Sequence, residues 1–236
     1  RRVHYRRSTV NAPDPNPTQP AMPATAAARC LMPGTKPRNK RGSTRTRMLV
    51  SAVEVLRECG AAGVTIDAVL TRSGAPRGAV YHHFPGGRQQ ILAEALQFAG
   101  DSISALIDER IEDGGLALVR RFVTFWEGAL ADSNYTAGCP VVAAAIAATD
   151  DEPHLAVAAS DIFTRWRESL GRAFAADGFE ESDAASLAVM CIAALEGAVV
   201  LCRTSRSADA LRDVLVQLEF LIRTREFVLH AARVSR

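Results

Sequence analysis

Aromatic residues are scarce in this sequence, and so is every residue pattern that indicates a catalytic or metal site. Aromatic side chains make up 6% of the 236 residues. Alanine, leucine and valine must therefore fill most of the core, which favours closely packed helices over twisted sheets. No carboxylate pair, Ser/His/Asp set, phosphate-binding loop or metal-ligand cluster has the spacing that catalysis requires. We expect no enzymatic activity, no metal and no cofactor.

Paired cysteines and long hydrophobic runs are also missing. The five cysteines include no Cys-x-x-Cys pair, which is typical of a reducing compartment where thiols stay free. No uninterrupted run reaches the roughly eighteen apolar residues of a membrane span. The basic first residues are followed by a proline-rich stretch where a signal peptide would have its apolar segment. We expect a cytoplasmic protein without a membrane segment.

Charge is distributed unevenly along the chain. The formal net charge is only +2, but residues 1–35 contribute +4, residues 36–88 contribute +7 and residues 89–236 contribute −9. A basic segment ahead of an acidic one is typical of a module that binds a polyanion, joined to a soluble domain whose copies repel one another. A solvated charged face, the alternative, explains a single basic helix better than it explains so large an excess.

The periodicity of apolar residues indicates helices throughout the chain after Ser43. Residues 1–38 hold seven of the eleven prolines and no periodic pattern, which predicts a disordered basic tail. After Ser43, apolar residues recur at helical spacing, and no segment alternates with the period of a strand. We predict an all-α fold of about nine helices, divided into a domain at residues 39–88 and a helical domain at residues 89–236.

Three short helices are predicted in the basic segment. The first presents one apolar face and ends at Gly60, and Thr65 is a good N-cap for the second. A tight turn at Gly74 leads to the third helix, which has Pro76 in its first turn and runs to about His83. Helix, short turn and helix is the layout of a helix-turn-helix, in which the second helix enters the major groove of DNA.

The segment from Gly74 to Arg88 reads Gly-Ala-Pro-Arg-Gly-Ala-Val-Tyr-His-His-Phe-Pro-Gly-Gly-Arg. It closely resembles the DNA-binding signature of the TetR family of repressors, and the resemblance covers residues 44–98. The commonest family pattern has Ser or Thr where Pro76 stands and one glycine fewer before Arg88. The Phe-Pro-Gly-Gly-basic version is similar to the lincomycin-resistance-type (LmrA/YxaF-like) subgroup. The resemblance implies a bacterial, nucleoid-associated repressor that binds double-stranded operator DNA.

The third helix should have one buried face and one face toward DNA. Val80 and Phe84, four residues apart, are expected to pack on the first helix. On the opposite face, Arg77 is the best candidate to read a guanine edge, because a guanidinium can form two hydrogen bonds to it. We expect Thr65 and Arg88, each at the start of a helix, to bind phosphates. The predicted DNA contacts are Arg45, Thr65, Arg77, Gly78, Ala79, Tyr81, His82 and Arg88.

Two motifs leave alternatives open. His82 and His83 could bind a metal, but adjacent helical residues point about 100° apart, so we expect one to be half-buried and the other to face DNA. The Gly-Cys-Pro sequence at Gly138 resembles a signature of the same subgroup and opens a helix. Cys139 is there either a reactive thiol, since a helix N-terminus lowers the pKa of a thiol, or a small residue in a tight turn.

Two consecutive helices near the C-terminus carry more apolar residues than one face can hold. Such surplus suggests a four-helix interface between two copies, and the resemblance implies a homodimer formed by the last two long helices. Two recognition helices would then meet the two halves of a palindromic operator. The predicted dimer contacts are Leu187, Cys191, Leu195, Ala198, Leu211, Leu215 and Leu218.

The remaining aromatic residues are candidates for a ligand pocket. Apolar walls with few polar groups suit a small hydrophobic effector, although bulky aromatics at helical spacing also serve as plain core. The predicted effector contacts are Phe122, Phe125, Trp126, Val142, Ile146, Phe163 and Trp166. The sequence thus favours a repressor released by an effector; the rival interpretations are a DNA-binding protein that responds to no ligand and, less well supported, an enzyme.

Overall fold

A computed structural model describes residues 43–147 and 153–234, and within these ranges it consists of nine α-helices and one 3₁₀ turn without a strand. The predicted all-α fold is confirmed, whereas the predicted tail at residues 1–38 lies outside the described residues. The helices are α2 (Thr44–Gly63), α3 (Ile66–Ser73), α4 (Gly78–His83), α5 (Gly87–Asp108), α6 (Gly115–Asp132), α7 (Pro140–Ala147), α8 (Pro153–Ala176), α9 (Glu181–Ser205) and α10 (Asp209–Val234), with η1 at Ile111–Asp113.

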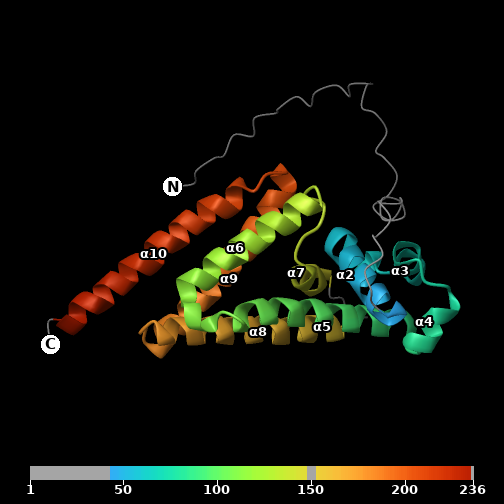
Figure 1. The fold of residues 1–236 in the computed structure, drawn as a ribbon, viewed down its shortest axis with the longest axis horizontal. Coiled ribbons are helices and arrows are strands. Elements are labelled where there is room, and N and C mark those ends of the chain that lie inside the picture. The colour runs from blue at the N-terminus through green and yellow to red at the C-terminus, as the bar shows by residue number, and fades with distance from the viewer. Residues whose placement is uncertain (1–42, 148–152, 235–236) are drawn as a thin grey trace, which may run out of the picture.

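Helices α2, α3 and α4 form a small head at one end of the molecule (Figure 1). Ser43 caps α2 by accepting a hydrogen bond from the backbone N–H of Thr46 at 3.3 Å. Gly60 has φ 72 and ψ −178 and interrupts the helix, close to where the sequence places its end. A residue with a side chain rarely adopts this backbone conformation, so glycine at this position defines where the regular part of α2 stops.

Helices α5 to α10 form the body of the molecule. Within it α5 and α8 run side by side, and α5 also packs on α2 of the head (Figure 1). The close approach of α5 and α8 depends on Gly100, because a Cβ atom there would lie 2.7 Å from Cδ1 of Ile162. A buried hydrophobic cluster runs without a break from Met48 in the head to Ile222 in α10. A shared core of this kind does not show whether the chain divides into two domains at residue 88, and that division stays a prediction.

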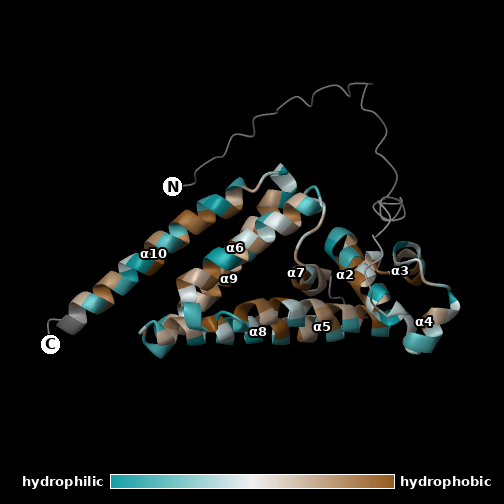
Figure 2. Cartoon of the chain, in the orientation of Figure 1, coloured by the Kyte–Doolittle hydropathy of each residue, from teal (hydrophilic) through white to brown (hydrophobic). Residues whose placement is uncertain are grey.

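Helix α9 packs on α8, α10 and α6. By length and composition it could cross a membrane, the one described helix of which this is true. The sequence expectation missed it because a few polar residues break every long apolar run. Figure 2 shows the apolar residues of α9 and α10 in brown. Half of the apolar window of α9 is buried by neighbouring helices, as in the core helix of a helical bundle.

Candidate nucleic-acid interface

The turn between α3 and α4 is built from the residues that the sequence indicates. The Thr65 hydroxyl oxygen accepts a hydrogen bond from the backbone N–H of Ala68 at 3.1 Å and so begins α3. Gly74 ends α3 with φ 65, and its N–H donates to the carbonyl oxygen of Leu70 at 2.9 Å. A left-handed glycine after the last turn is a common helix terminator. It turns the chain sharply and presents α4 at an angle to α3.

Helix α4 is held by two buried side chains and exposes the opposite face. Val80 and Phe84 are completely buried, as predicted, whereas Gly78 and His82 are exposed and the exposed fraction of Tyr81 is 61%. His83 is half-buried, and its ring meets the ring of His82 edge to face with centroids 4.7 Å apart. Because the residues on the exposed face are small, the backbone of α4 can come close to the bases when the helix enters a DNA groove.

Pro76 lies just before α4, whereas the sequence pattern places it in the first turn of that helix. The regular part of α4 begins at Gly78, and Pro76 precedes it by two residues. The carbonyl oxygens of Pro76 and Arg77 accept hydrogen bonds from the N–H groups of Ala79 and Val80 at 2.8 and 3.2 Å. These tight turns make the first turn of the helix shorter than an α-turn, so the proline opens the helix without belonging to it.

Arg77 and Asp67 form an ion pair across the two helices of the motif. Nη1 of Arg77 lies 3.0 Å from Oδ1 of Asp67, and both side chains are mostly exposed. Arg77 is the N-cap of α4, and Asp67 is in the first turn of α3. A pair this exposed stabilises the fold little. It holds the Arg77 guanidinium near the N-terminal ends of both α3 and α4.

Arg45 and Arg88, two of the predicted DNA contacts, already make contacts within the chain. Arg45 forms an ion pair with Glu94 of α5 and lies 5.1 Å from the centroid of the Phe84 ring. Nη2 of Arg88 donates to the carbonyl oxygen of Ala61 at 2.9 Å. These contacts orient both guanidinium groups beside the motif. Whether either group also binds DNA stays a prediction.

The turn before α5 accommodates the extra glycine of this sequence. Gly87 has φ 63, and its N–H donates to the carbonyl oxygen of Phe84 at 2.8 Å. The side-chain oxygen of Gln90 accepts from the N–H of Gly86 at 2.8 Å, which satisfies one of the unpaired donors at the start of α5. Arg88 therefore stands in the first turn of α5, as the sequence predicts.

Sequence reasoning missed the contacts that join the head to the body. Arg203 of α9 donates to the carbonyl oxygen of Thr136 at 2.7 Å and to that of Glu58 in α2 at 3.4 Å. Arg57 of α2 reaches Gly138 from the other side. The loop before α7 is thus bound by one arginine from the head and one from the body. No local pattern could have indicated these contacts, because the partners lie up to 145 positions apart.

Cys139 is not the activated thiol that one of the sequence alternatives describes. The thiol is buried at the start of α7. Burial and the neighbouring Glu196 carboxyl raise the pKa of Cys139 well above its usual value, and the N–H groups of Val142 and Val141 oppose this increase only in part. The thiol therefore stays protonated near neutral pH. The structure favours the alternative in which Cys139 is a small residue that begins a helix.

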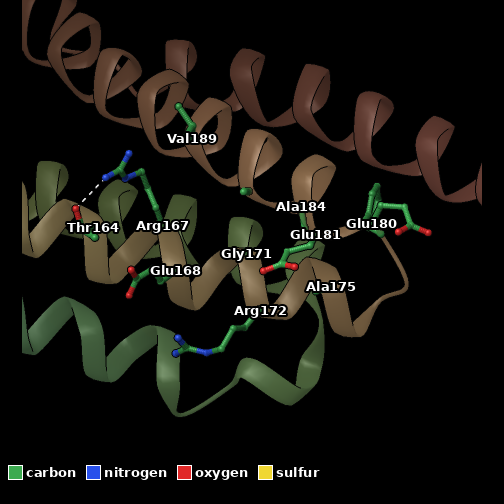
Figure 3. A pocket seen from close by; sticks show the side chains of 12 residues that line it. Thr164, Arg167, Glu168, Gly171, Arg172, Ala175, Glu180, Glu181, Ala184 and Val189 are labelled. Carbon is green, nitrogen blue, oxygen red and sulfur yellow. Dashed lines mark hydrogen bonds between the residues drawn. The ribbon is translucent and has the colours of Figure 1, made fainter.

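The seven predicted effector contacts do not line one pocket. Trp126 and Trp166 are buried, Phe122, Val142 and Phe163 are half-buried, and Phe125 and Ile146 are exposed, Ile146 by 79%. Phe122 and Trp166 line an apolar cavity of only about 20 Å³ between α5, α6, α8 and α9. A larger groove of about 710 Å³ lies open along α8 and α9 (Figure 3), and none of the seven lines it. Its lining includes Arg167 and Arg172 instead.

Six of the seven predicted dimer contacts are buried inside the chain, and this assignment is corrected. Leu187, Cys191, Leu195, Ala198, Leu211 and Leu218 have exposed fractions of at most 4%, and Leu215 is half-buried. They form the contacts of α9 and α10 with the rest of the body. The apolar surplus of these helices lies on other faces, on Val189, Met190, Val200, Leu201, Val216, Phe220, Phe227 and Val228.

Comparison with known proteins agrees with this geometry. Residues 48–95 match the family described as bacterial regulatory proteins of the tetR family, and residues 115–217 match the C-terminal domain of LmrA/YxaF-like transcriptional regulators. An HTH-type transcriptional regulator of Mycobacterium tuberculosis (strain H37Rv) is 40% identical over 184 residues, which cover 75% of this chain and 93% of the relative. LmrA, an HTH-type transcriptional regulator of Bacillus subtilis (strain 168), is 25% identical over 73% of this chain and 93% of its own length.

Solved structures show the same fold. A regulatory protein TetR from Rhodobacter sphaeroides superposes with a TM-score of 0.65 at 21% identity, covering 75% of this chain and 97% of its own. A TetR transcriptional regulator from Legionella pneumophila superposes with a TM-score of 0.66 at 17% identity, covering 78% and 99%. At this level of identity the likeness concerns the arrangement of helices alone.

Proposed function

Since this chain belongs to the TetR family of bacterial transcriptional regulators with a helix-turn-helix and an LmrA/YxaF-like C-terminal domain, we propose that it is a cytoplasmic, nucleoid-associated repressor. It binds a palindromic operator as a homodimer and is released by a small hydrophobic effector. It has no enzymatic role. The observation that carries the proposal is helix α4, whose buried residues fix it in the head while its exposed face is thin and basic at one end.

DNA binding follows from the shape and charge of that face. Arg77 stands at the N-terminal end of α4, where a recognition helix contacts base edges. Gly78 and Ala79 leave room for the bases, and the Tyr81 hydroxyl is available for a phosphate. Thr65 retains a hydroxyl hydrogen for a phosphate, because its oxygen is the acceptor in the cap of α3. These side chains form the proposed interface together with Arg45, His82 and Arg88.

A second copy of the chain is the proposed partner of the exposed faces of α9 and α10. Of the fourteen large hydrophobic residues exposed in the described part of the chain, eight lie on these two helices. Exposed apolar residues that gather on neighbouring helices commonly mark an interaction surface. Because a two-fold interface uses the same surface of both copies, α9 and α10 of each would form a four-helix interface, and the two α4 helices would face the same side of DNA.

Effector release requires that the ligand bind better to the form whose two heads do not fit the operator. The body offers aromatic walls for such a ligand at Phe122 and Trp166, but their cavity of about 20 Å³ holds no drug-sized molecule. The helices would have to separate on binding. The small cavity favours a second candidate function, a DNA-binding regulator without a ligand.

One experiment tests DNA binding and both candidates. The full chain is used to capture genomic DNA fragments, which are sequenced and then bound in mobility-shift assays. We expect a shared palindrome whose half-sites are one or two helical turns apart. Binding with no sequence preference would contradict the repressor, and an operator affinity unchanged by every hydrophobic compound tested would favour the regulator without a ligand.

A further inference from the structure

A cluster of buried polar groups lies where the head meets the body. Glu196 of α9 is 7% exposed, and apart from the Cys139 thiol no group in the described part of the chain donates a hydrogen bond to its carboxyl oxygens. Trp126 of α6 is 1% exposed, and its Nε1 also lacks a partner there. Nη2 of Arg57 is buried and likewise unpaired among the described residues. The DNA-binding function uses none of these atoms.

The groups are neighbours in space although they come from four different elements. The Cys139 thiol lies beside the Glu196 carboxyl, and it also lies close enough to Arg57 for the two to interact electrostatically. The guanidinium carbon of Arg57 is 5.8 Å from the centroid of the Trp126 ring. These contacts link the Glu196 carboxyl, the Cys139 thiol, the Arg57 guanidinium and the Trp126 ring as successive neighbours between α9 and α6.

The cluster continues the apolar cavity of the body. Phe122 and Ile192 line that cavity, and Trp126 and Glu196 each follow four residues later on the same helix. Residues four apart lie on one face of a helix, one turn from each other. The polar cluster therefore lies one helical turn beyond the apolar cavity, along both α6 and α9.

The fold gives no reason for a carboxyl group at this position. A buried acidic group without donors destabilises a protein, and an apolar side chain of similar volume usually improves stability. The Cys139 thiol favours the charged form of the carboxyl, but a thiol has only one weak donor and cannot satisfy both carboxyl oxygens. A donor from outside the chain would satisfy it, and aromatic rings beside a carboxylate suit a ligand with an apolar part and one polar end.

We infer that Glu196 is the polar anchor of the effector site, where it accepts a hydrogen bond from an apolar molecule that carries one protonated amine or one hydroxyl group. Phe122, Trp166 and Ile192 surround the apolar part of that molecule once the helices separate. This assignment rests on the proposed effector-responsive function and specifies its ligand chemistry. It also places the ligand one residue from Gly138, which is hydrogen-bonded to the head.

Three probes of nearly equal shape test the donor requirement: 3-phenylpropylamine, 3-phenylpropan-1-ol and butylbenzene. The chain has two tryptophans, Trp126 in the cluster and Trp166 at the cavity, so tryptophan fluorescence reports binding. We expect the full chain to bind the amine or the alcohol about tenfold more tightly than butylbenzene. Glu196→Leu should remove this preference, and Glu168→Gln, a control on α8 in the open groove of Figure 3, should keep it.

Glu196→Gln separates the two kinds of donor. Gln keeps a hydrogen-bond acceptor but loses the charge, so preference for the amine should fall about tenfold while preference for the alcohol changes little. Thermal unfolding of each variant shows that it is folded, and Glu196→Leu should be at least as stable as the parent because it removes an unpaired buried group. A structural role for Glu196 predicts the opposite, a less stable variant with an unchanged order of probe affinities.

The outcomes distinguish this inference from the proposed function. Equal affinity of the parent for all three probes, no saturable binding of any, or a donor preference that survives Glu196→Leu overturns the anchor while operator binding stands. Loss of the preference in Glu196→Leu, with operator affinity without probe unchanged, supports it. If the chain binds no operator, the proposed function fails, and the probe measurements still decide the role of Glu196.

Discussion

Arg57 and Gly138 exchange two hydrogen bonds across the boundary between head and body. Nε of Arg57 donates to the carbonyl oxygen of Gly138 at 3.1 Å, and the N–H of Gly138 donates to the carbonyl oxygen of Arg57 at 2.9 Å. The C-terminal half of α2 is therefore bound to the loop that precedes α7. Besides α5, which continues from head to body, this contact gives the body a second connection to the DNA-binding motif.

Replacing Arg57 by Met should loosen this connection. The variant keeps the aliphatic stem but loses the hydrogen bond to Gly138 and the contact with the Trp126 ring, so the free energy of unfolding should fall by about 1–2 kcal/mol. Hydrogen exchange of the Gly138 amide should become faster. Arg110→Met on the surface should change stability by less than about 0.5 kcal/mol. Equal effects of the two substitutions would show that the connection contributes nothing specific.

Arg77→Ala and Arg88→Ala should affect DNA binding in different ways. We expect Arg77→Ala to cost about 1–3 kcal/mol on the operator and to relax the preference at one base position, whereas Arg88→Ala weakens binding to all sequences alike. Competition assays with operator and unrelated DNA measure both effects. Because Arg88 also bonds to Ala61, its variant must be compared at a temperature where it is fully folded. Uniform loss from both would refute this division of roles.

Val216→Glu should weaken the homodimer. Val216 is 61% exposed on α10, and a charge buried at an apolar interface is strongly unfavourable. Val157→Glu on α8 is a matched control, because Val157 is 62% exposed and lies outside the proposed interface. Sedimentation velocity at micromolar concentration should find the first variant monomeric and the second dimeric. Dimers of both variants would place the interface on another surface.

The Glu196 carboxyl should make stability depend on pH. Burial raises its pKa from 4.5 to about 7, and the Cys139 thiol opposes this increase in part. Between these values the folded chain keeps a proton that the unfolded chain releases, so the free energy of unfolding should fall as pH rises, by up to about 3 kcal/mol. Above pH 7 the effect is constant.

Glu196→Gln isolates that dependence. Chemical unfolding of the parent and the variant at several pH values gives the difference between their unfolding free energies, which cancels the titration of other groups. We expect the difference to change with pH only between about 4.5 and 7. A difference that is constant over this range would mean that the carboxyl is solvated in the folded protein.

The sequence predicted best what is determined locally. Thr65 and Gly74 define the ends of α3 through their own backbone chemistry, and the four-residue spacing of Val80 and Phe84 identifies the buried face of a short helix. Periodicity failed on α9, which is apolar on more than one side. Leu187 and Val189 look alike in such a pattern, and only the positions of α8 and α10 decide that the first is buried and the second exposed.

The polar cluster at Glu196 leaves one signal in the sequence. An acidic residue in the middle of an apolar helix is unusual, because burying its charge is costly. Its neighbours could not be derived in the same way, since Arg57, Trp126 and Cys139 come together only when four separate elements pack. Sequence patterns indicate that such a residue is exceptional, and the fold shows which groups it meets.

The ion pair between Arg77 and Asp67 has a consequence for the response of DNA binding to salt. A basic side chain that replaces condensed cations on DNA makes affinity fall as salt concentration rises. In the proposed complex Arg77 is already paired with Asp67, so its net release of ions should be small. The dependence of operator affinity on salt should therefore be shallower than the number of basic groups at the interface suggests, and Asp67→Asn should make it steeper.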